Sequence, residues 1–284
     1  MGAAEVVVTG ATGAVGRYVA RRLGAAGRLL VRDPQKAAGL ELPGRVLVGD
    51  YREPESLARA FRGARAVFAV TNNPLRPQDD ENILAAAAEA GVGHVVKVSW
   101  LGVADPGADD LVARWNRESE ERLRASGLGW TVLRPRTPMS NALSWARGVR
   151  EEGVVRAFGG DAATACVDPR DVADVAVAAL LDPAAHAGRT YALTGPRPVS
   201  AREQVAVLAE VSGRPLRFEE LSADQALAAW RRALPEPVAQ ALLDAALRRA
   251  GGAAARVHPE VGEVLGRPAG TFRDWAQRYR GAFA

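Results

Sequence analysis

The feature that most constrains the fold is a glycine-rich turn near the N-terminus, placed between a short apolar segment and an amphipathic one. It reads VTGATGAVGRYVARRL, with glycines at Gly10, Gly13 and Gly16. Residues 5–8 predict a buried strand, and apolar side chains recur at helical spacing after the turn. Glycines permit a tight turn and let the backbone approach a pyrophosphate, whose charge meets the N–H groups that open the helix. The sequence therefore predicts a dinucleotide-binding turn.

Strands and helices alternate along the first half of the chain. Helices are expected at 79–90 and 111–125, and the segment GDYREPESLARAF predicts a further turn and helix. The expected strands are 5–8, 29–31, 46–48, 66–70, 94–99 and 130–134. This alternation implies right-handed crossovers and an α/β fold, a Rossmann-type doubly wound parallel sheet with helices on both faces.

The residues after the second strand indicate which dinucleotide is bound. An acidic residue about 20 positions beyond the first glycine would bind the ribose 2′-OH of NAD, whereas an arginine there accommodates the 2′-phosphate of NADP. Arg32 directly follows the strand that ends at Val31, and Lys36 lies one turn further on. Asp33 also follows, but Asp-Pro is a common turn opener. We expect NADP(H), the alternative being that Arg32 is an ordinary surface arginine.

Other cofactor contacts are expected by position alone. Asp50 and Tyr51 end the third strand and would flank the adenine. The residues after the fourth strand would line the pyrophosphate and ribose, and the backbone after the sixth would touch the nicotinamide. The full set of expected cofactor residues is Gly10, Thr12, Gly13, Ala14, Val15, Gly16, Arg32, Lys36, Asp50, Tyr51, Val70, Thr71, Asn72, Lys97, Pro135 and Met139.

The alternation weakens after Pro135, which predicts a second and smaller part. Strands are expected at 154–158 and 189–195, with helices at 141–150, 168–183, 202–212, 222–233, 235–250 and 271–282. We expect residues 1–138 to form the NADP(H)-binding domain, with 154–195 returning to it. Residues 139–153 and 196–284 would form a mostly helical substrate-binding lobe. A lobe packed at the carboxyl edge of the sheet would wall a cleft, because open α/β sheets bind ligands there.

Composition excludes several classes of protein. A hydrophobic content of 48% with 25% charged residues is ordinary for a globular protein. The net charge is +4, but the arginines are scattered among acidic residues without a basic block, so no nucleic-acid partner is expected. No apolar run could span a bilayer and no signal peptide is evident, which predicts a cytoplasmic protein. Cys166 is the single cysteine and no metal site is expected. A monomer and a dimer both remain open.

Several segments together resemble a known family. VTGATGAVGRYVARRL, VRDPQKA, GDYREPESLARAFRG, VSWLG, SEERLRASGLGWTVLRP and MSN are similar to the NmrA-like group of atypical short-chain dehydrogenases/reductases, as is the later VDPRDVADVAVAALLDPAAHAGRTYALTGP. The resemblance covers nearly the whole chain. Members of this group are quinone reductases, ketoreductases or redox-sensing regulators without catalysis, so the resemblance implies one of these functions for the chain. Within the group, the chain resembles angucyclinone ketoreductases such as that of simocyclinone biosynthesis.

The proton donor of most short-chain reductases is missing. That donor is the Tyr of a Tyr-x-x-x-Lys pair, whose Lys lowers the tyrosine pKa. The residues four positions after Tyr18, Tyr51, Tyr191 and Tyr279 are arginine, glutamate, glycine and phenylalanine. The usual acid chemistry therefore cannot be transferred to this chain.

Two side chains could position a substrate carbonyl instead. Ser99, at the end of the fifth strand, matches the family's active-site serine, and Asn116 lies on the following helix. One preorganised donor to a developing oxyanion contributes about 2.7–4 kcal/mol. For Ser99 the alternative is a hydroxyl that caps the loop. Lys97 lies within an apolar strand, where it would either contact the nicotinamide ribose or have a structural role.

Aromatic side chains favour a flat substrate. Trp100, Trp115, Trp145 and Trp230 fall near the expected cleft beside Met139, although each could be a core residue. With Ser99, these residues form the expected substrate site. The sequence thus predicts an NADPH-dependent ketoreductase of an aromatic polycyclic, polyketide-type small molecule. The alternatives are an NADPH-dependent quinone reductase and a non-catalytic NADP(H)-sensing regulatory protein.

Overall fold

The computed structural model describes residues 5–284, which form two compact units. The first unit consists of residues 5–100, Trp115–Arg134 and Pro169–Ala192. The second consists of Leu101–Arg114, Pro135–Asp168 and Leu193–Ala284. The expected division had placed 101–114, 135–138, 154–168 and 193–195 with the nucleotide-binding domain, whereas these residues belong to the second unit.

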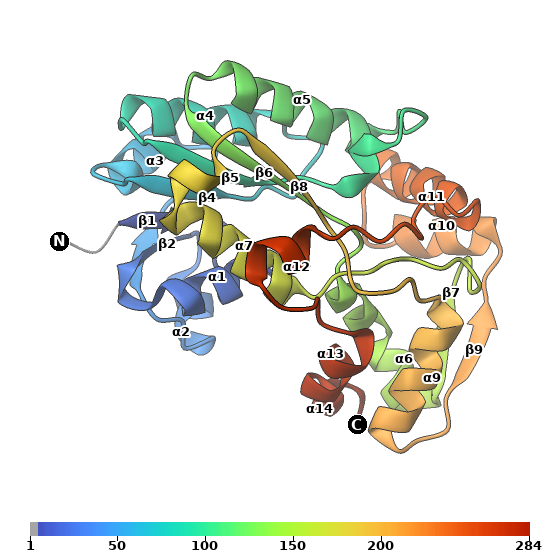
Figure 1. Cartoon of the computed structure of the whole chain (residues 1–284). Coiled ribbons are helices and arrows are strands. Elements are labelled where there is room, and N and C mark those ends of the chain that lie inside the picture. The colour runs from blue at the N-terminus through green and yellow to red at the C-terminus, as the bar shows by residue number, and fades with distance from the viewer. Residues whose placement is uncertain (1–4) are drawn as a thin grey trace. The chain divides into compact units, whose positions relative to one another are not determined.

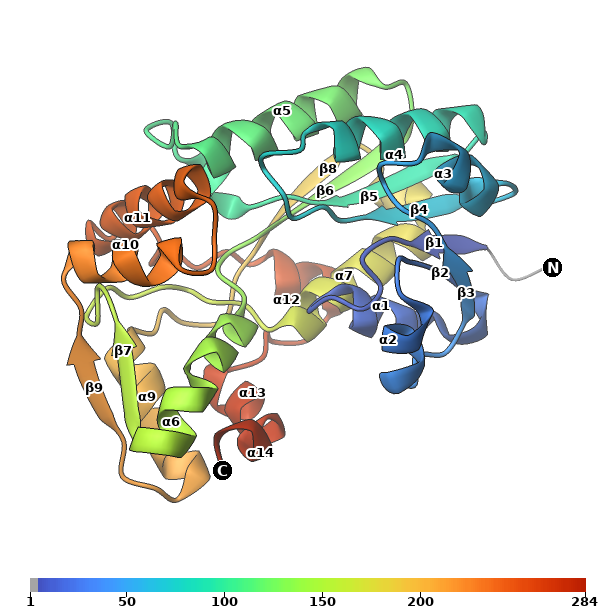
Figure 2. The same cartoon turned by 180° about the vertical axis from the view of Figure 1, so that it is seen from behind.

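A seven-stranded sheet is the centre of the first unit, in the order β3-β2-β1-β4-β5-β6-β8 (Figures 1 and 2). Its strands are β1 (Val6–Val8), β2 (Gly27–Val31), β3 (Arg45–Val48), β4 (Ala66–Ala69), β5 (His94–Val98), β6 (Gly129–Pro135) and β8 (Arg189–Leu193). Every neighbouring pair from β3 to β6 is parallel. The strand order reverses between β1 and β4, the point at which such sheets bind nucleotides. The expected Rossmann-type fold is confirmed.

Helices cover both faces of this sheet. One face carries α3 (Pro54–Phe61), α4 (Gln78–Glu89) and the first unit's part of α5 (Leu111–Ala125), while α1 (Gly16–Leu23) packs against α7 (Pro169–Leu181) on the other (Figures 1 and 2). Two shorter helices, α2 (Pro34–Gly39) and α8 (Pro183–His186), complete the unit, together with a 3-10 turn at Gly24–Ala26.

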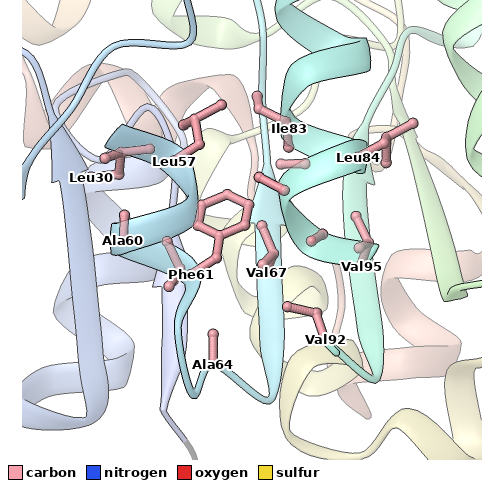
Figure 3. Close-up of a cluster of buried hydrophobic side chains, with 14 of the residues drawn as sticks. Leu30, Leu57, Ala60, Phe61, Ala64, Val67, Ile83, Leu84, Val92 and Val95 are labelled. Carbon is pink, nitrogen blue, oxygen red and sulfur yellow. The ribbon is translucent and has the colours of Figure 1, made fainter. Parts of the chain in front are cut away.

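The core beneath α3 and α4 explains why the strands read as continuous apolar runs. Phe61 of α3 is fully buried and points toward α4, and it shares one hydrophobic cluster with Ile83 of α4 and with Val67 and Val95 of the central strands (Figure 3). Strands covered on both faces need apolar side chains on both sides. Burying each such side chain contributes about 1.5–3 kcal/mol, so this layer fixes the carboxyl ends of β1, β4 and β5 in place.

The second unit is mostly helical, as expected. Its helices are α6 (Ala146–Glu152), α9 (Ala201–Ser212), α10 (Ala223–Arg231), α11 (Glu236–Ala250), α12 (Glu260–Leu265), α13 (Phe272–Arg278) and α14 (Arg280–Phe283). Two 3-10 segments, Leu101–Ala104 and Met139–Trp145, belong to it as well. The helix predicted at 141–150 is therefore a 3-10 segment that continues into α6.

A small second sheet explains the different division of the chain. β7 (Val154–Ala157) pairs in parallel with β9 (Arg217–Glu220), so the segment around 154–158 does not join the large sheet. The sequence RFEE of β9 carries too many charges to have been predicted as a strand. The buried side of this sheet shares a hydrophobic cluster with α6, α9, α13 and α14, which is centred on the fully buried Trp275.

Candidate cofactor and active site

The glycine turn adopts a conformation that other residues would disrupt. Gly10 has a φ of +57°, and a Cβ added there would lie 2.4 Å from Val70 Cγ1. A Cβ on Gly16 would lie 2.2 Å from the carbonyl oxygen of Gly10. Helix α1 begins after Val15, which provides no side-chain cap, and its first turn has no acidic residue. The N-terminus of α1 therefore has backbone N–H groups without a side-chain cap, which is the arrangement that binds anions.

Thr9 fixes this turn to the neighbouring strand. Its Oγ1 donates to the carbonyl of Phe68 at 3.0 Å and accepts from the backbone N–H of Val70 at 2.9 Å. The Tyr51 hydroxyl donates to the carbonyl of Val70 at 3.3 Å, and burial raises the pKa of this phenol. Asn82 Nδ2 donates to the Tyr51 carbonyl at 2.7 Å. The structure thus brings together Gly10, Tyr51 and Val70, while sequence reasoning missed the two side chains that hold them.

Asp33 and Arg32, which follow β2, have different surroundings. Asp33 caps α2, since its Oδ1 accepts from the backbone N–H groups of Gln35 at 2.9 Å and Lys36 at 3.3 Å. Arg32 is exposed, and its side chain has no hydrogen bond or ion pair within residues 5–284. A free guanidinium beside an occupied carboxylate fits a 2′-phosphate better than a 2′-hydroxyl.

Asp50 lies two residues after β3, and its carboxylate is already engaged. Arg52 donates to both oxygens at 2.7–3.1 Å. These hydrogen bonds, with a smaller effect from the charge of Arg32, lower the pKa of Asp50 to about 2. Asp50 is therefore ionised at neutral pH and still has acceptor capacity. The remaining expected residues of the turn and of the end of β4 are exposed or half-buried: Thr12, Gly13, Ala14, Val15, Thr71 and Asn72.

Lys97 forms a buried ion pair instead of reaching the surface. Its Nζ lies 2.8 Å from Asp80 Oδ1, and both side chains are 2% exposed. Thr71 Oγ1 donates to the same oxygen at 2.8 Å, and Trp115 Nε1 donates to the other oxygen at 3.0 Å. Lys97 therefore holds Thr71 and Trp115 in place through Asp80. The only sequence signal for Asp80 was an acidic run at the start of a helix.

Ser99 belongs to a second buried network. Its Oγ donates to Glu120 Oε1 at 2.5 Å, and Glu120 also accepts from Arg134 at 2.9 and 2.6 Å and from Arg124 at 2.7 Å. Burial alone would raise the pKa of Glu120, but the hydrogen bonds from Arg134 and Ser99 outweigh it and lower the pKa. A hydroxyl has one hydrogen to donate, and Ser99 gives it to Glu120. In this arrangement Ser99 can accept from a ligand but cannot donate to one.

The four tyrosines have contacts that do not involve Ser99. Tyr51 donates at the end of β3, as described above, and the Tyr191 hydroxyl lies 2.8 Å from His186 Nδ1. The guanidinium groups of Arg17 and Arg170 lie over the Tyr18 ring, and Tyr279 stacks on Trp275. Asn116 is buried on α5. No contact here supplies an acidic phenol near the end of β5.

The candidate aromatic residues have structural partners of their own. Trp115 is tied to Asp80, and Trp100 is half-buried. Within the second unit, Trp145 packs on the cluster that contains Met139, and Trp230 packs on Leu227 and Leu243 in a separate cluster. Pro135 and Met139 are buried. The contacts of Trp115, Trp145 and Trp230 agree with the alternative that these residues belong to the protein core.

Two classes of site are not found in the described part of the chain. Residues 5–284 contain no group of three or more His, Cys, Asp or Glu side chains that could hold a metal ion. None of the helices described is both long and apolar enough to cross a bilayer.

The chain is similar to a nucleotide-binding family and to individual reductases. A family described as NAD(P)H-binding matches residues 10–183. The chain is 54% identical over 281 residues to a (4-alkanoyl-5-oxo-2,5-dihydrofuran-3-yl)methyl phosphate reductase of Streptomyces griseus, covering 98% of this chain and 99% of the relative. It is 35% identical to an NAD(P)H azoreductase of Xenophilus azovorans, with 98% and 99% covered. The NADPH complex of an Escherichia coli NADPH-dependent quinone oxidoreductase has a TM-score of 0.81 at 26% identity, with 96% and 99% covered.

Proposed function

This chain belongs to the NAD(P)H-binding family, and from that membership we propose that it reduces the conjugated ring double bond of a phosphate-bearing acyl dihydrofuranone. Support for this substrate class comes from the 54% identity to a reductase named for such a compound, which extends over nearly the full length of both chains. NADPH would be the reductant.

Two broader expectations from the sequence are confirmed. The chain is an NAD(P)H-dependent oxidoreductase, and its cofactor is of the NADP(H) type. The alternative of a non-catalytic sensor has less support, because these relatives are named as reductases or oxidoreductases.

The residues that would hold the cofactor fit it sterically and electrostatically. The backbone of Gly10–Gly16 would receive the pyrophosphate, because an added Cβ at either end of that turn would clash. Arg32, with Lys36, would bind the 2′-phosphate, and Asp50 with Tyr51 would flank the adenine. Further contacts are proposed for Val70, Thr71 and Asn72 with the ribose and pyrophosphate, and for Pro135 and Met139 with the nicotinamide.

The observation that carries the choice of reaction is that the Ser99 hydroxyl gives its hydrogen to Glu120 and that the sequence has no Tyr-x-x-x-Lys pair. The hydroxyls of Tyr51 and Tyr191 contact the Val70 carbonyl and His186 instead. A simple ketone would produce a strongly basic alkoxide that needs a proton donor. A reductase without that donor is better suited to a substrate that stabilises its own negative charge.

A 4-acyl-5-oxo-2,5-dihydrofuran is such a substrate. Its ring double bond is conjugated to the lactone carbonyl and to the acyl ketone. The bound NADPH would supply a hydride to ring carbon 3 and leave as NADP⁺. The displaced π electrons would be shared between the two carbonyl oxygens, and water would provide the proton that reaches ring carbon 4. The chain's own residues then need only bind, orient and enclose the two reactants.

A polycyclic aryl ketone or quinone is the second candidate. The observation in its favour is the likeness to quinone and azo reductases, whose named substrates are conjugated. It has less support, because Trp115, Trp145 and Trp230 already pack against other residues. The NADPH consumed by either reaction also favours a cytoplasmic location.

The two candidates are separated by comparing substrates. We expect kcat/KM with NADPH to be at least tenfold higher for the acyl dihydrofuranone phosphate than for any quinone or polycyclic aryl ketone tested. A higher value for an aryl ketone would reject the dihydrofuranone in favour of the second candidate.

A further inference from the structure

Arg136 is a half-buried cation with no ion-paired carboxylate among residues 5–284. It directly follows β6, and its Nε is buried without a hydrogen-bond partner. Within residues 5–284 its guanidinium makes no hydrogen bond and no ion pair. Burial lowers the pKa of this guanidinium, and the charge of Asp105 partly opposes the effect. Arginine remains charged under these conditions, so an unpaired and partly desolvated positive charge is maintained here.

The backbone that carries this cation is held in place. The Arg136 N–H donates to the carbonyl of Leu193 at 2.8 Å. On the following residues, the Val167 N–H donates to Thr137 at 3.0 Å, and the Met139 N–H donates to Val167 at 2.9 Å. Three backbone hydrogen bonds within four residues fix the main chain from which the half-buried Arg136 side chain extends.

Asp105, whose charge acts on Arg136, also lies beside another arginine. Arg248 of α11 pairs with Asp110 and lies 3.8 Å from Asp105. Asp110 is also occupied by the backbone N–H groups of Val112 and Ala113, at 2.9 and 3.1 Å. Arg249, the next residue along α11, likewise has a pKa lowered by burial and no carboxylate partner within the described chain. Neither Arg136 nor Arg249 therefore has a carboxylate partner within the described chain.

We propose that Arg136 binds the phosphate group of the substrate. This inference rests on the proposed function, because the named relative's substrate carries a phosphate ester on the carbon attached to ring carbon 3. Only one methylene and one oxygen separate that phosphorus from the carbon that would accept the hydride. The group that holds the phosphate must therefore lie beside the nicotinamide. In the sequence, Arg136 lies between Pro135 and Met139, the two residues proposed to contact the nicotinamide.

An arginine is chemically suited to this role. Its planar guanidinium can form two parallel hydrogen bonds to a phosphate, which fixes orientation as well as affinity. Such charge-assisted hydrogen bonds would favour the phosphate ester over the corresponding alcohol by about 10- to 150-fold. The phosphate would thus set specificity and align the ring for reduction.

The test compares the phosphate ester with its dephosphorylated alcohol. For the wild type we expect kcat/KM to be at least tenfold higher for the ester. Arg136→Gln should reduce kcat/KM for the ester at least tenfold and change that for the alcohol by less than twofold, and Arg136→Lys should recover part of the loss. Arg147→Gln is the matched control, because Arg147 is an exposed arginine of the same unit paired with Glu151. Equal losses on both substrates, or none, would overturn the proposal.

A binding measurement separates this inference from the proposed function. Equilibrium dialysis with labelled inorganic phosphate would be performed at saturating NADP⁺, and thermal denaturation would verify that each variant is folded. If the wild type reduces neither compound, the proposed function fails. Phosphate binding that Arg136→Gln weakens at least tenfold would still support an anion site at Arg136. Equal phosphate binding by both proteins would contradict it.

Discussion

Lys97 and Asp80 form an ion pair in the interior of the first unit, with Nζ 2.8 Å from Oδ1 and each side chain 2% exposed. Thr71 and Trp115 also donate hydrogen bonds to the Asp80 carboxylate. A buried pair with all its hydrogen bonds made contributes rigidity more than net stability. Its consequence is that the segment after β4 and the middle of α5 are positioned by one shared carboxylate.

Removing one member of this pair should destabilise the fold. We expect Asp80→Asn and Lys97→Met each to lower the free energy of unfolding by about 3–5 kcal/mol, because an uncompensated charge or a partly unsatisfied network remains buried. Urea denaturation followed by tryptophan fluorescence would measure this loss. The double variant should lose less than the sum of the two single losses. Additive losses would show that the two groups do not interact.

The exposed guanidinium at the end of β2 predicts coenzyme preference. Arg32→Ala should raise the Kd for NADPH at least tenfold, because charge-assisted hydrogen bonds contribute about 1.5–3 kcal/mol, and should leave the Kd for NADH nearly unchanged. Fluorescence titration with both coenzymes measures the effect. Arg45→Ala, at the exposed amino end of β3, serves as the control. An equal increase in the Kd for NADPH and for NADH would show that Arg32 does not bind the 2′-phosphate.

The close approach of Gly16 to Gly10 predicts a steric effect. Gly16→Ala should weaken NADPH binding at least tenfold, because the new methyl group would force the turn away from its present path. Gly39→Ala is the matched control, since an added Cβ there meets nothing within 4 Å. Isothermal titration calorimetry on both variants would compare them. An unchanged Kd for Gly16→Ala would mean that the turn does not hold the pyrophosphate.

The Glu120 network predicts a dependence of stability on pH. The folded-state pKa of Glu120 lies below its ordinary value of 4.5, so the unfolded chain binds the proton more readily. The stabilisation from this group is therefore complete above pH 4.5 and is lost as the pH falls through the lowered pKa. Glu120→Gln should show a shallower fall in the free energy of unfolding on acidification than the wild type. Glu121→Gln, exposed on the same helix, should follow the wild type. Parallel curves for wild type and Glu120→Gln would contradict the assignment.

Local patterns were sufficient to predict the fold and the glycine-rich turn between β1 and α1. Gly10 and Gly16 are recognisable because a strand, a turn and a helix lie next to one another in the sequence, and Arg32 because it directly follows an apolar strand. The partners of Lys97 and Ser99 were not predictable. Asp80 and Glu120 lie on helices 17 and 21 residues away in sequence, and only tertiary packing brings their carboxylates to the strand.

The division of the chain was also only partly predictable. The segment around Val154 has the pattern of any short strand, and its partner is the highly charged β9, so nothing local indicates a separate sheet. Arg136 was overlooked for a similar reason. One arginine among many carries no signal until the structure shows that it has no ion-paired carboxylate among residues 5–284.

The position of the transferred hydrogen tests the central claim most directly. The protein would be incubated with the acyl dihydrofuranone phosphate and NADPH that carries deuterium at the transferable position, and the product examined by mass spectrometry and NMR. We predict one deuterium on ring carbon 3, next to the phosphomethyl group, with the acyl ketone intact. Deuterium on a newly formed carbinol carbon, or no transfer to this substrate, would contradict reduction of the conjugated double bond.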